Sequence, residues 1–423
     1  MPTYYPRASV AFLAILEGET EVRRFACIPR SVEVERNDHR HADTANLEVD
    51  YRDLPLDPRT VRSLAVQVYL GDVASMDGEL STSDAHRRFL GYVDEPEATL
   101  EEAGEVVRLQ CRDYTALFLD FRWPETKIRV DRAFTDVIAE VLATVPGAGE
   151  MKVAFDADGA GALQLSAMIG RSAFAPQDKD DAWTVLVDLC GRAGLIPVVV
   201  LDTLRIVSAS DAGTGSVRFL YGQNVATLRY RRKYNETATQ QIEVRCWDEQ
   251  ARATRIAQYP AAAITTRRKV SATGKISTEN APILAFYVAG TYTEAQLGDI
   301  ARRIYDEAAR EQFEGELETA EMADLDDVDV LGLANGDAIS VRLGSNLLAS
   351  IEGMSPGEAV THLVSGASAL DEAVARALVA AWQKAEGRVT TFYVKSALHS
   401  WSRDDGYRLK VSFIRYVGEA PGA

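Results

Sequence analysis

The sequence predicts a β-rich α+β fold made of several domains. Stretches in which every second residue is apolar fill most of the first 125 residues and return after residue 216, as in half-buried strands of antiparallel sheets. Between them, apolar residues recur at helical spacing. The chain has 423 residues, of which 47% are hydrophobic, so it can bury sizeable cores. Its length corresponds to roughly two to four domains.

The first β region covers residues 1–125. Its alternating segments are residues 47–51, 64–70 and 107–111, and the loops between them are rich in Asp, Ser, Pro and Gly. Several short strands at this spacing predict a barrel or a sandwich.

A small α+β module is predicted over residues 126–215. Its first helix should span residues 131–145, with Asp131 as the cap and Pro146-Gly147 as the stop. A second helix over residues 183–193 is closed by Gly194 and leads into a strand pair at 196–201 and 203–207. The Gly- and Ser-rich residues 209–216 are predicted to be the exit linker.

A second β domain is predicted over residues 216–344, starting with strands at 225–232 and 240–247. Thr293 and Gln296 form a capping box that begins a helix over residues 293–311. An acidic stretch, 314–329, and a strand at 338–343 follow.

Residues 345–387 are predicted to be helical. Helix starts are expected at 355–358 and 368–371. One apolar stripe should face a surface, and it consists of Leu370, Val374, Leu378, Ala381 and Trp382. The last part, residues 388–423, should complete the second β domain with a hairpin of strands 389–398 and 407–417, turned by 404–406.

The charge, the hydropathy and the cysteine spacing argue against several classes of protein. The net charge is −17, whereas proteins that wrap nucleic acid neutralise phosphates with Lys and Arg. No segment approaches the ~20 apolar residues of a membrane helix, and residues 1–16 do not have the pattern of a secretion signal. The four cysteines are widely spaced, which favours free thiols and synthesis in a reducing compartment.

The sequence contains none of the common motifs for catalysis or cofactor binding. There is no Gly-x-Ser-x-Gly elbow, Walker loop or Cys-x-x-Cys pair, and we expect no cofactor. His39 and His41, flanked by Asp38 and Asp43, could hold a metal or form a polar loop, and the polar loop is favoured. A plain turn is favoured over a calcium loop at 156–159, and a solvated charge run over a calcium site at Asp324, Asp326, Asp327 and Asp329.

An ordered series of segments resembles phage tail baseplate hub proteins of the late-control protein D type. The segments are 89–94, 107–117, 182–186, 203–206, 221–225, 336–337, 392–402 and 406–407, and the matches extend over about residues 8–417. The positions that follow the family pattern are Gly91, Asp94, Asp113, Gly222, Asn224, Gly336, Asp337, His399, Trp401, Gly406 and Tyr407. Each has a structural explanation, and none needs to be catalytic.

The resemblance implies two tube-type β-barrels, each with a flanking helix, joined by the small module and assembled as a homotrimer. Six quasi-equivalent barrels would let a trimeric spike meet a hexameric tail tube. The expected partners are the tail tube protein, the spike protein, and possible further contacts with the tape-measure protein and other baseplate proteins. The expected location is the virion tail tip or baseplate, after synthesis in the bacterial cytoplasm, in a phage or a contractile injection system. DNA or cargo would pass through the channel without specific binding, past acidic side chains that face the bore.

The chain departs from the family pattern in two ways, and two other functions stay open. Residues 345–387 resemble an insertion into the family pattern, and no spike or lysozyme module is expected in this chain. The alternatives to a non-enzymatic hub are a cell-wall glycosidase of the tail tip, which needs two carboxylates in a cleft, and a module that binds the host surface.

Overall fold

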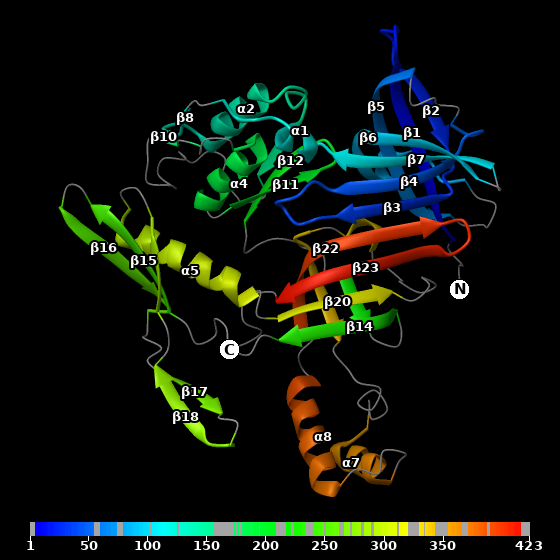
Figure 1. The fold of residues 1–423 in the computed structure, drawn as a ribbon. Helices are drawn as coiled ribbons and strands as arrows, with labels where there is room; N and C mark the ends of the chain where they lie inside the picture. Colours follow the sequence, from blue (N-terminus) through cyan, green and yellow to red (C-terminus); the bar gives the residue numbers. More distant parts are fainter. Residues whose placement is uncertain are drawn as a thin grey trace.

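The fold contains one extended sheet with smaller units attached to it (Figure 1). The computed structural model describes residues 5–54, 60–73, 79–101, 104–124, 127–155, 173–174, 176, 180–193, 195–208, 217–220, 224–232, 241–248, 251–261, 266–270, 273–280, 283–288, 292–310, 313–319, 330–333, 335–342, 354–365, 371–386 and 390–415. The predicted linker 209–216, the candidate calcium segments 156–159 and 324–329, and Gly222 lie outside these residues.

The extended sheet has 13 strands, and its main path runs β14-β20-β23-β22-β3-β4-β7-β6-β5-β1-β2. β21 pairs with β22, and β13 pairs with β21. The bounds are β1 Tyr5–Leu16, β2 Arg23–Cys27, β3 Ser31–Arg36, β4 Thr44–Asp50, β5 Val61–Val73, β6 Arg87–Glu101, β7 Gly104–Asp113, β13 Val217–Leu220, β14 Val225–Arg232, β20 Phe313–Thr319, β21 Ala338–Arg342, β22 Thr390–Ser402 and β23 Gly406–Arg415.

A five-strand motif occurs twice in this sheet. The strands β3, β4, β5, β6 and β7 follow one another in the chain and pair in the order β5-β6-β7-β4-β3. The strands β14, β20, β21, β22 and β23 also follow this chain order and pair as β21-β22-β23-β20-β14. Both copies carry a register shift at the same place, between Val93 and Glu95 in β6 and between Val394 and Ser396 in β22.

The two motifs join through an antiparallel pair between β22 and β3, from Ala397↔Arg36 to Ser402↔Ser31. One hydrophobic core lies along both, because alternate residues of each strand face it. In β3 the buried residues are Val32 and Val34, while Glu33 and Glu35 are exposed on the other face. The alternation that predicted strands at 47–51, 64–70 and 107–111 is confirmed by β4, β5 and β7.

A helical unit follows β7. It contains α1 Thr115–Leu119, α2 Phe134–Thr144 and α4 Ala182–Ala193, the sheet of β9 Lys152–Phe155, β11 Leu195–Val200 and β12 Thr203–Ser208, and the short pair β8 Ile128–Arg129 and β10 Ala173–Phe174. Both predicted helices and the hairpin are confirmed. The predicted cap is wrong, because Ala133 is the N-cap of α2 and Asp131 binds Arg129 instead.

A second unit is inserted between β14 and β20. Its sheet runs β16-β15-β19, and α5 covers one face of it. The bounds are β15 Gln241–Asp248, β16 Ala253–Tyr259, β17 Thr266–Val270, β18 Ile276–Asn280, β19 Ile283–Tyr287 and α5 Glu294–Arg310. The capping box is confirmed: the backbone N–H of Thr293 donates to Gln296 Oε1 at 2.9 Å, and that of Gln296 donates to Thr293 Oγ1 at 3.3 Å.

A pair of helices, α7 Pro356–Ser365 and α8 Glu372–Glu386, is inserted between β21 and β22 and projects away from the sheet (Figure 1). Its core is small and consists of Ala359, Leu363, Ala375 and Val379. The predicted stripe is wrong at Val374, which is 49% exposed, because α8 turns Ala375 and Val379 toward α7.

Two further predictions differ from the structure. Residues 314–319 of the predicted acidic stretch belong to β20, where Leu317 is buried and the glutamates between the apolar positions face outward. The last hairpin is longer than predicted, since β22 continues to Ser402. The β-rich α+β class is confirmed, and the pairing of the described strands does not close a barrel. Within the described ranges, no helix combines the length and apolar character needed to cross a membrane.

Candidate functional site

The candidate site is the polar face of the extended sheet, together with the buried contacts that hold the sheet to its neighbours. Charged residues on this face have a single sign within each strand: Arg229 and Arg231 in β14; Glu314, Glu316 and Glu318 in β20; Arg408 and Lys410 in β23; Glu33 and Glu35 in β3; Glu48 and Asp50 in β4; Arg108 and Arg112 in β7; Glu95 and Glu97 in β6. The face is therefore mixed in charge rather than uniformly acidic.

Opposite charges on neighbouring strands form ion pairs across this face. Arg108 Nε lies 2.9 Å from Glu48 Oε1, and Lys410 Nζ lies 3.7 Å from Glu316 Oε2. Arg231 pairs with Glu314. Such cross-strand pairs stabilise a register modestly, because exposed charges are screened by water and salt. Because every basic strand lies beside an acidic one, this face presents paired charges and no continuous positive surface for anions.

Three positions of the family pattern meet where β7 leaves the sheet. A Cβ atom on Gly91 would lie 2.1 Å from the carbonyl oxygen of Arg112, so no larger residue fits there without backbone movement. Asp113 is 4% exposed and accepts hydrogen bonds from the Thr115 amide at 3.1 Å and the Thr115 hydroxyl at 3.0 Å. Asp113 thereby fixes the first residue of α1.

Asp94 lies in the same region, at the surface, and its carboxylate binds Arg112. Arg112 Nε donates to Asp94 Oδ2 at 2.6 Å, and Arg112 Nη2 donates to Asp120 Oδ2 at 2.8 Å. These two carboxylates raise the pKa of the Arg112 guanidinium. The three side chains connect β6, β7 and the end of α1.

The half-buried carboxyl of Asp43, which the sequence suggests only as a flank of the His39 and His41 loop, lies beside Asp113. Arg36 Nη1 donates to Asp43 Oδ2 at 2.7 Å, and the Asn37 amide donates to Asp43 Oδ1 at 2.8 Å. The Asp113 amide donates to the Asp43 carbonyl at 3.0 Å. Burial and, for Asp113, the charge of Asp43 raise the pKa of both carboxyls, against the opposing effect of Arg36.

The loop that carries Asp43 also anchors the helical unit. Trp183 in α4 is buried, and its indole Nε1–H donates to the His39 carbonyl at 2.9 Å. His41 Nδ1 lies 2.8 Å from Asp38 Oδ1 at the surface. No group of three or more possible metal ligands occurs among the residues that the structure describes, here or elsewhere. The favoured polar-loop interpretation of 38–43 fits these contacts.

The C-terminal positions of the family pattern form a second buried group. His399 is 2% exposed, with Nδ1 2.7 Å from the Tyr407 hydroxyl and Nε2 2.8 Å from the Leu333 carbonyl oxygen. Burial lowers the pKa of His399 to about 4. Trp401 lies opposite Tyr407 in the β22–β23 register, and both are buried.

Gly336 and Gly406 of the pattern are turn positions. Gly336 has a φ of +94° and Gly406 a φ of +71°, both in the left-handed region that favours glycine. The Gly336 amide donates to the Val394 carbonyl at 3.1 Å, and the Val394 amide donates to the Asp337 carbonyl at 2.9 Å. Asn224 lies in the turn before β14.

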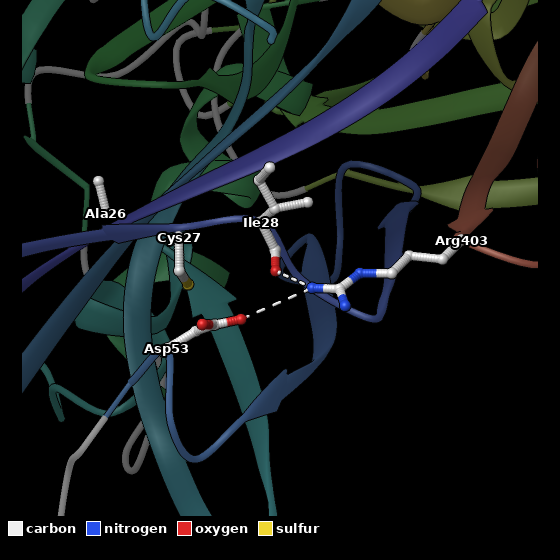
Figure 2. Close-up of a pocket in the computed structure, with 5 residues that line it drawn as sticks. All are labelled: Ala26, Cys27, Ile28, Asp53 and Arg403. Atoms are coloured by element: carbon white, nitrogen blue, oxygen red, sulfur yellow. Dashed lines mark hydrogen bonds and ion pairs between the residues drawn. The ribbon is translucent and has the colours of Figure 1, made fainter. Parts of the chain in front are cut away.

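Arg403, in the turn between β22 and β23, makes a further junction that the sequence does not reveal (Figure 2). Its Nη2 donates to the Ile28 carbonyl at 2.7 Å, its Nε donates to the Pro29 carbonyl at 3.0 Å, and its Nη1 donates to Asp50 Oδ2 at 3.2 Å. Figure 2 shows the side chain reaching across a small pocket toward Asp53. The C-terminal hairpin is thus fixed to the N-terminal motif.

No protein-family model matches this sequence, and a search of curated proteins finds no relative. Solved structures do share its fold. The tail protein from Neisseria meningitidis MC58 superposes with a TM-score of 0.60 at 12% identity, covering 97% of this chain and 97% of that chain. The 43 kDa tail protein of prophage MuSo2 from Shewanella oneidensis superposes with a TM-score of 0.53 at 13% identity, covering 96% of this chain and 98% of that chain. The chain therefore has the fold of phage tail proteins, as the sequence resemblance predicts.

Proposed function

We propose that this protein is a structural, non-enzymatic hub at the tip of a phage tail or a related injection machine. The observation that carries the proposal is the extended sheet, in which one five-strand motif occurs twice with an apolar face and a polar face. A fold shared with a tail protein and a prophage tail protein over nearly the whole chain supports it. The hub joins the tail tube to the spike.

In this proposal the chain has two tube-type units, at 1–125 and 216–344, with the hairpin of 388–423 completing the second. The module 126–215 and the helical pair of 345–387 are additional units attached to these two. Three copies present six similar motifs, which match a hexameric tube on one side and a trimeric spike on the other. Each motif would complete its barrel only in the ring.

The polar face of the sheet lines the channel in this arrangement. Its alternation of acidic and basic strands gives no continuous basic surface for phosphate to follow, so DNA or cargo passes without being held. An acidic bore, expected from the net charge of −17, stays a prediction for the assembled ring.

The projecting helical pair is proposed to contact a neighbouring baseplate component. Its described residues form a core of four buried side chains, and it lies away from the sheet (Figure 1). Deletion of 348–386 should leave the sheet folded and reduce particle assembly. Unchanged assembly of the deletion variant would refute the docking role.

Co-assembly tests the proposed function. The chain is expressed with the tube and spike proteins of the same gene cluster, and the purified material is imaged by electron microscopy. The proposal predicts a complex in which this chain lies between tube and spike. Failure of the three proteins to associate would overturn it, and clearing of a peptidoglycan suspension by the purified chain would favour the glycosidase instead.

A further inference from the structure

The small sheet of β15, β16 and β19 exposes many apolar side chains. Twelve large hydrophobic residues are exposed in the described part of the chain, and six of them lie in these three strands: Trp247, Ile256, Ile283, Leu284, Phe286 and Tyr287. Figure 1 shows β15 and β16 at the side of the molecule, with α5 between them and the extended sheet. A contiguous exposed apolar patch indicates a surface that binds a partner or a membrane.

The outer face of this sheet carries the two most exposed aromatic side chains of the patch. Alternate residues of β15 turn toward α5, so Trp247 lies on the opposite, outer face. Tyr287 pairs with Arg245 in the register of β15 and β19 and shares that face. Trp247 is 56% and Tyr287 74% exposed.

Arg245 lies between these aromatic residues without adding net charge. Its Nη1 donates to the Tyr287 hydroxyl at 3.0 Å, and its guanidinium carbon lies 5.6 Å from the centre of the Tyr287 ring. Arg245 also forms an ion pair with Glu243. Because the charges compensate each other, the outer face can lose water at a lower cost than a face with an unpaired guanidinium.

The strand β19 is apolar on both of its faces. Leu284 and Phe286 lie opposite two core residues of β15 and therefore point to the side of α5, yet they remain 40% and 38% exposed. Among the described strands, only β15 pairs with β19. The apolar patch thus continues around a projecting strand instead of ending at one face.

Basic residues are concentrated beside this patch. Residues 241–288 contain seven Lys or Arg and four Asp or Glu, a net charge of +3, whereas the whole chain has −17. Arg267, Arg268 and Lys269 follow one another in β17, and Lys275 precedes β18 in the same hairpin. Figure 1 shows this hairpin beyond the end of the β15–β16 sheet.

We propose that the sheet of β15, β16 and β19 and the hairpin of β17 and β18 bind the surface of an anionic phospholipid bilayer. Trp and Tyr side chains are enriched at the interface between membrane and water, and clusters of Lys and Arg attract anionic headgroups. The inference goes beyond the hub role and does not depend on it.

The shape of the patch favours a lipid interface over a rigid partner. A fluid interface contacts both faces of a projecting strand, whereas the flat surface of a folded protein covers one. The contact is shallow, because the free peptide groups along the edge of β19 need water or headgroups as hydrogen-bond partners. Repulsion between the acidic remainder of the chain and the lipid is screened beyond about 8 Å at physiological salt, so binding places this unit toward the bilayer.

Vesicle flotation with the full chain tests the proposal. Vesicles of equal parts phosphatidylglycerol and phosphatidylcholine should carry the chain upward, and pure phosphatidylcholine vesicles should not. Arg267→Glu with Lys269→Glu should weaken binding by roughly tenfold or more. Arg129→Glu with Arg376→Glu changes the net charge equally at exposed positions elsewhere and should leave binding unchanged.

The aromatic contact has its own pair of variants. Trp247→Ser with Tyr287→Ser should weaken flotation by roughly tenfold, because both side chains lose their burial in the interface. The control is Tyr230→Ser with Val374→Ser, which removes two exposed apolar side chains from other units. Equal binding of all variants, or equal binding to both kinds of vesicle, would overturn the proposal.

Tryptophan fluorescence reports the depth of the contact. Lipids brominated in their acyl chains should quench the wild type, and the quenching should disappear in Trp247→Phe, since Trp123, Trp183 and Trp401 are buried. Quenching that persists in this variant would contradict insertion of Trp247. Binding of purified peptidoglycan or of the tube protein through Trp247, without vesicle binding, would assign the patch to a glycan or a protein and overturn the lipid assignment. None of these outcomes changes the co-assembly that tests the hub.

Discussion

The imidazole of His399 is held between the Tyr407 hydroxyl, 2.7 Å from Nδ1, and the Leu333 carbonyl oxygen, 2.8 Å from Nε2. Because a carbonyl only accepts, Nε2 must carry a proton. Burial lowers the pKa of the ring to about 4, so at neutral pH it is uncharged and Nδ1 accepts from the tyrosine. It connects the last hairpin to the residues after the 3₁₀ turn Val330–Gly332.

The first prediction is a loss of stability in mild acid that depends on His399. Burial lowers its pKa to about 4, below the ordinary 6.5, so the unfolded chain binds the proton more tightly than the folded one. The stabilisation is present above pH 6.5 and is lost as the pH falls toward 4, with a total on the order of 3 kcal/mol. Urea unfolding of wild type and His399→Gln between pH 7.5 and 5 measures it. Equal slopes for both proteins would contradict the prediction.

Asp113 should have the opposite pH dependence. Burial, then the nearby charge of Asp43, raise its pKa well above the ordinary value, so the folded chain binds this proton more tightly. Its contribution is present below the unfolded pKa and is lost as the pH rises through the folded pKa. Asp113→Asn should therefore flatten the fall in stability from acid toward alkaline pH. Thermal unfolding of both proteins across this range checks the slope, and a variant as pH-dependent as wild type would refute it.

Asp43→Asn should destabilise the chain, because an amide has one acceptor oxygen where the carboxylate accepts from both Arg36 Nη1 and the Asn37 amide. It removes the carboxylate that receives Arg36 and leaves that guanidinium part-buried without its ion-pair partner. A loss of about 2 kcal/mol is expected, the usual range for a hydrogen bond to a charged group. Glu33→Gln, on the exposed face of β3, is the matched control and should change the free energy of unfolding little.

Gly91→Ala should destabilise the chain by about 3 kcal/mol, as an overpacked buried position does. The added Cβ would meet the Arg112 carbonyl oxygen at 2.1 Å, which is backbone and cannot turn away. Gly298→Ala is the control, because no heavy atom lies within 4 Å of the Cβ position and the residue is inside α5. That change should stabilise by about 1 kcal/mol. Similar unfolding midpoints for both variants would contradict the packing around Gly91.

Local patterns in the sequence predict a helix or strand well where the residues of that element themselves carry the pattern. The helix at Glu294–Arg310 is recognisable from its capping box, and the strands of the first motif from their alternation. The sequence does not predict β20, because the glutamates of this segment mask the buried Leu317. The apolar stripe of α8 was misplaced at Val374 because Ala375, a small residue with a weak signal, is the one that packs.

The repeated motif and the buried contacts depend on residues far apart in the chain. The second motif is interrupted by the α5 unit and by α7 and α8, so its spacing does not match that of the first. Asp43 meets Asp113, and Arg403 meets Ile28, only after the sheet has formed. Gly91, Asp113 and His399 could be singled out by resemblance, but their contacts come from the structure.

A cryo-EM map of the assembled tail tip tests the central claim most directly. The account predicts three copies of this chain in a ring between tube and spike, with the polar face of the sheet toward the channel. A map in which this chain lies outside the tube axis, or in which the apolar core side of the sheet faces the channel, would contradict it.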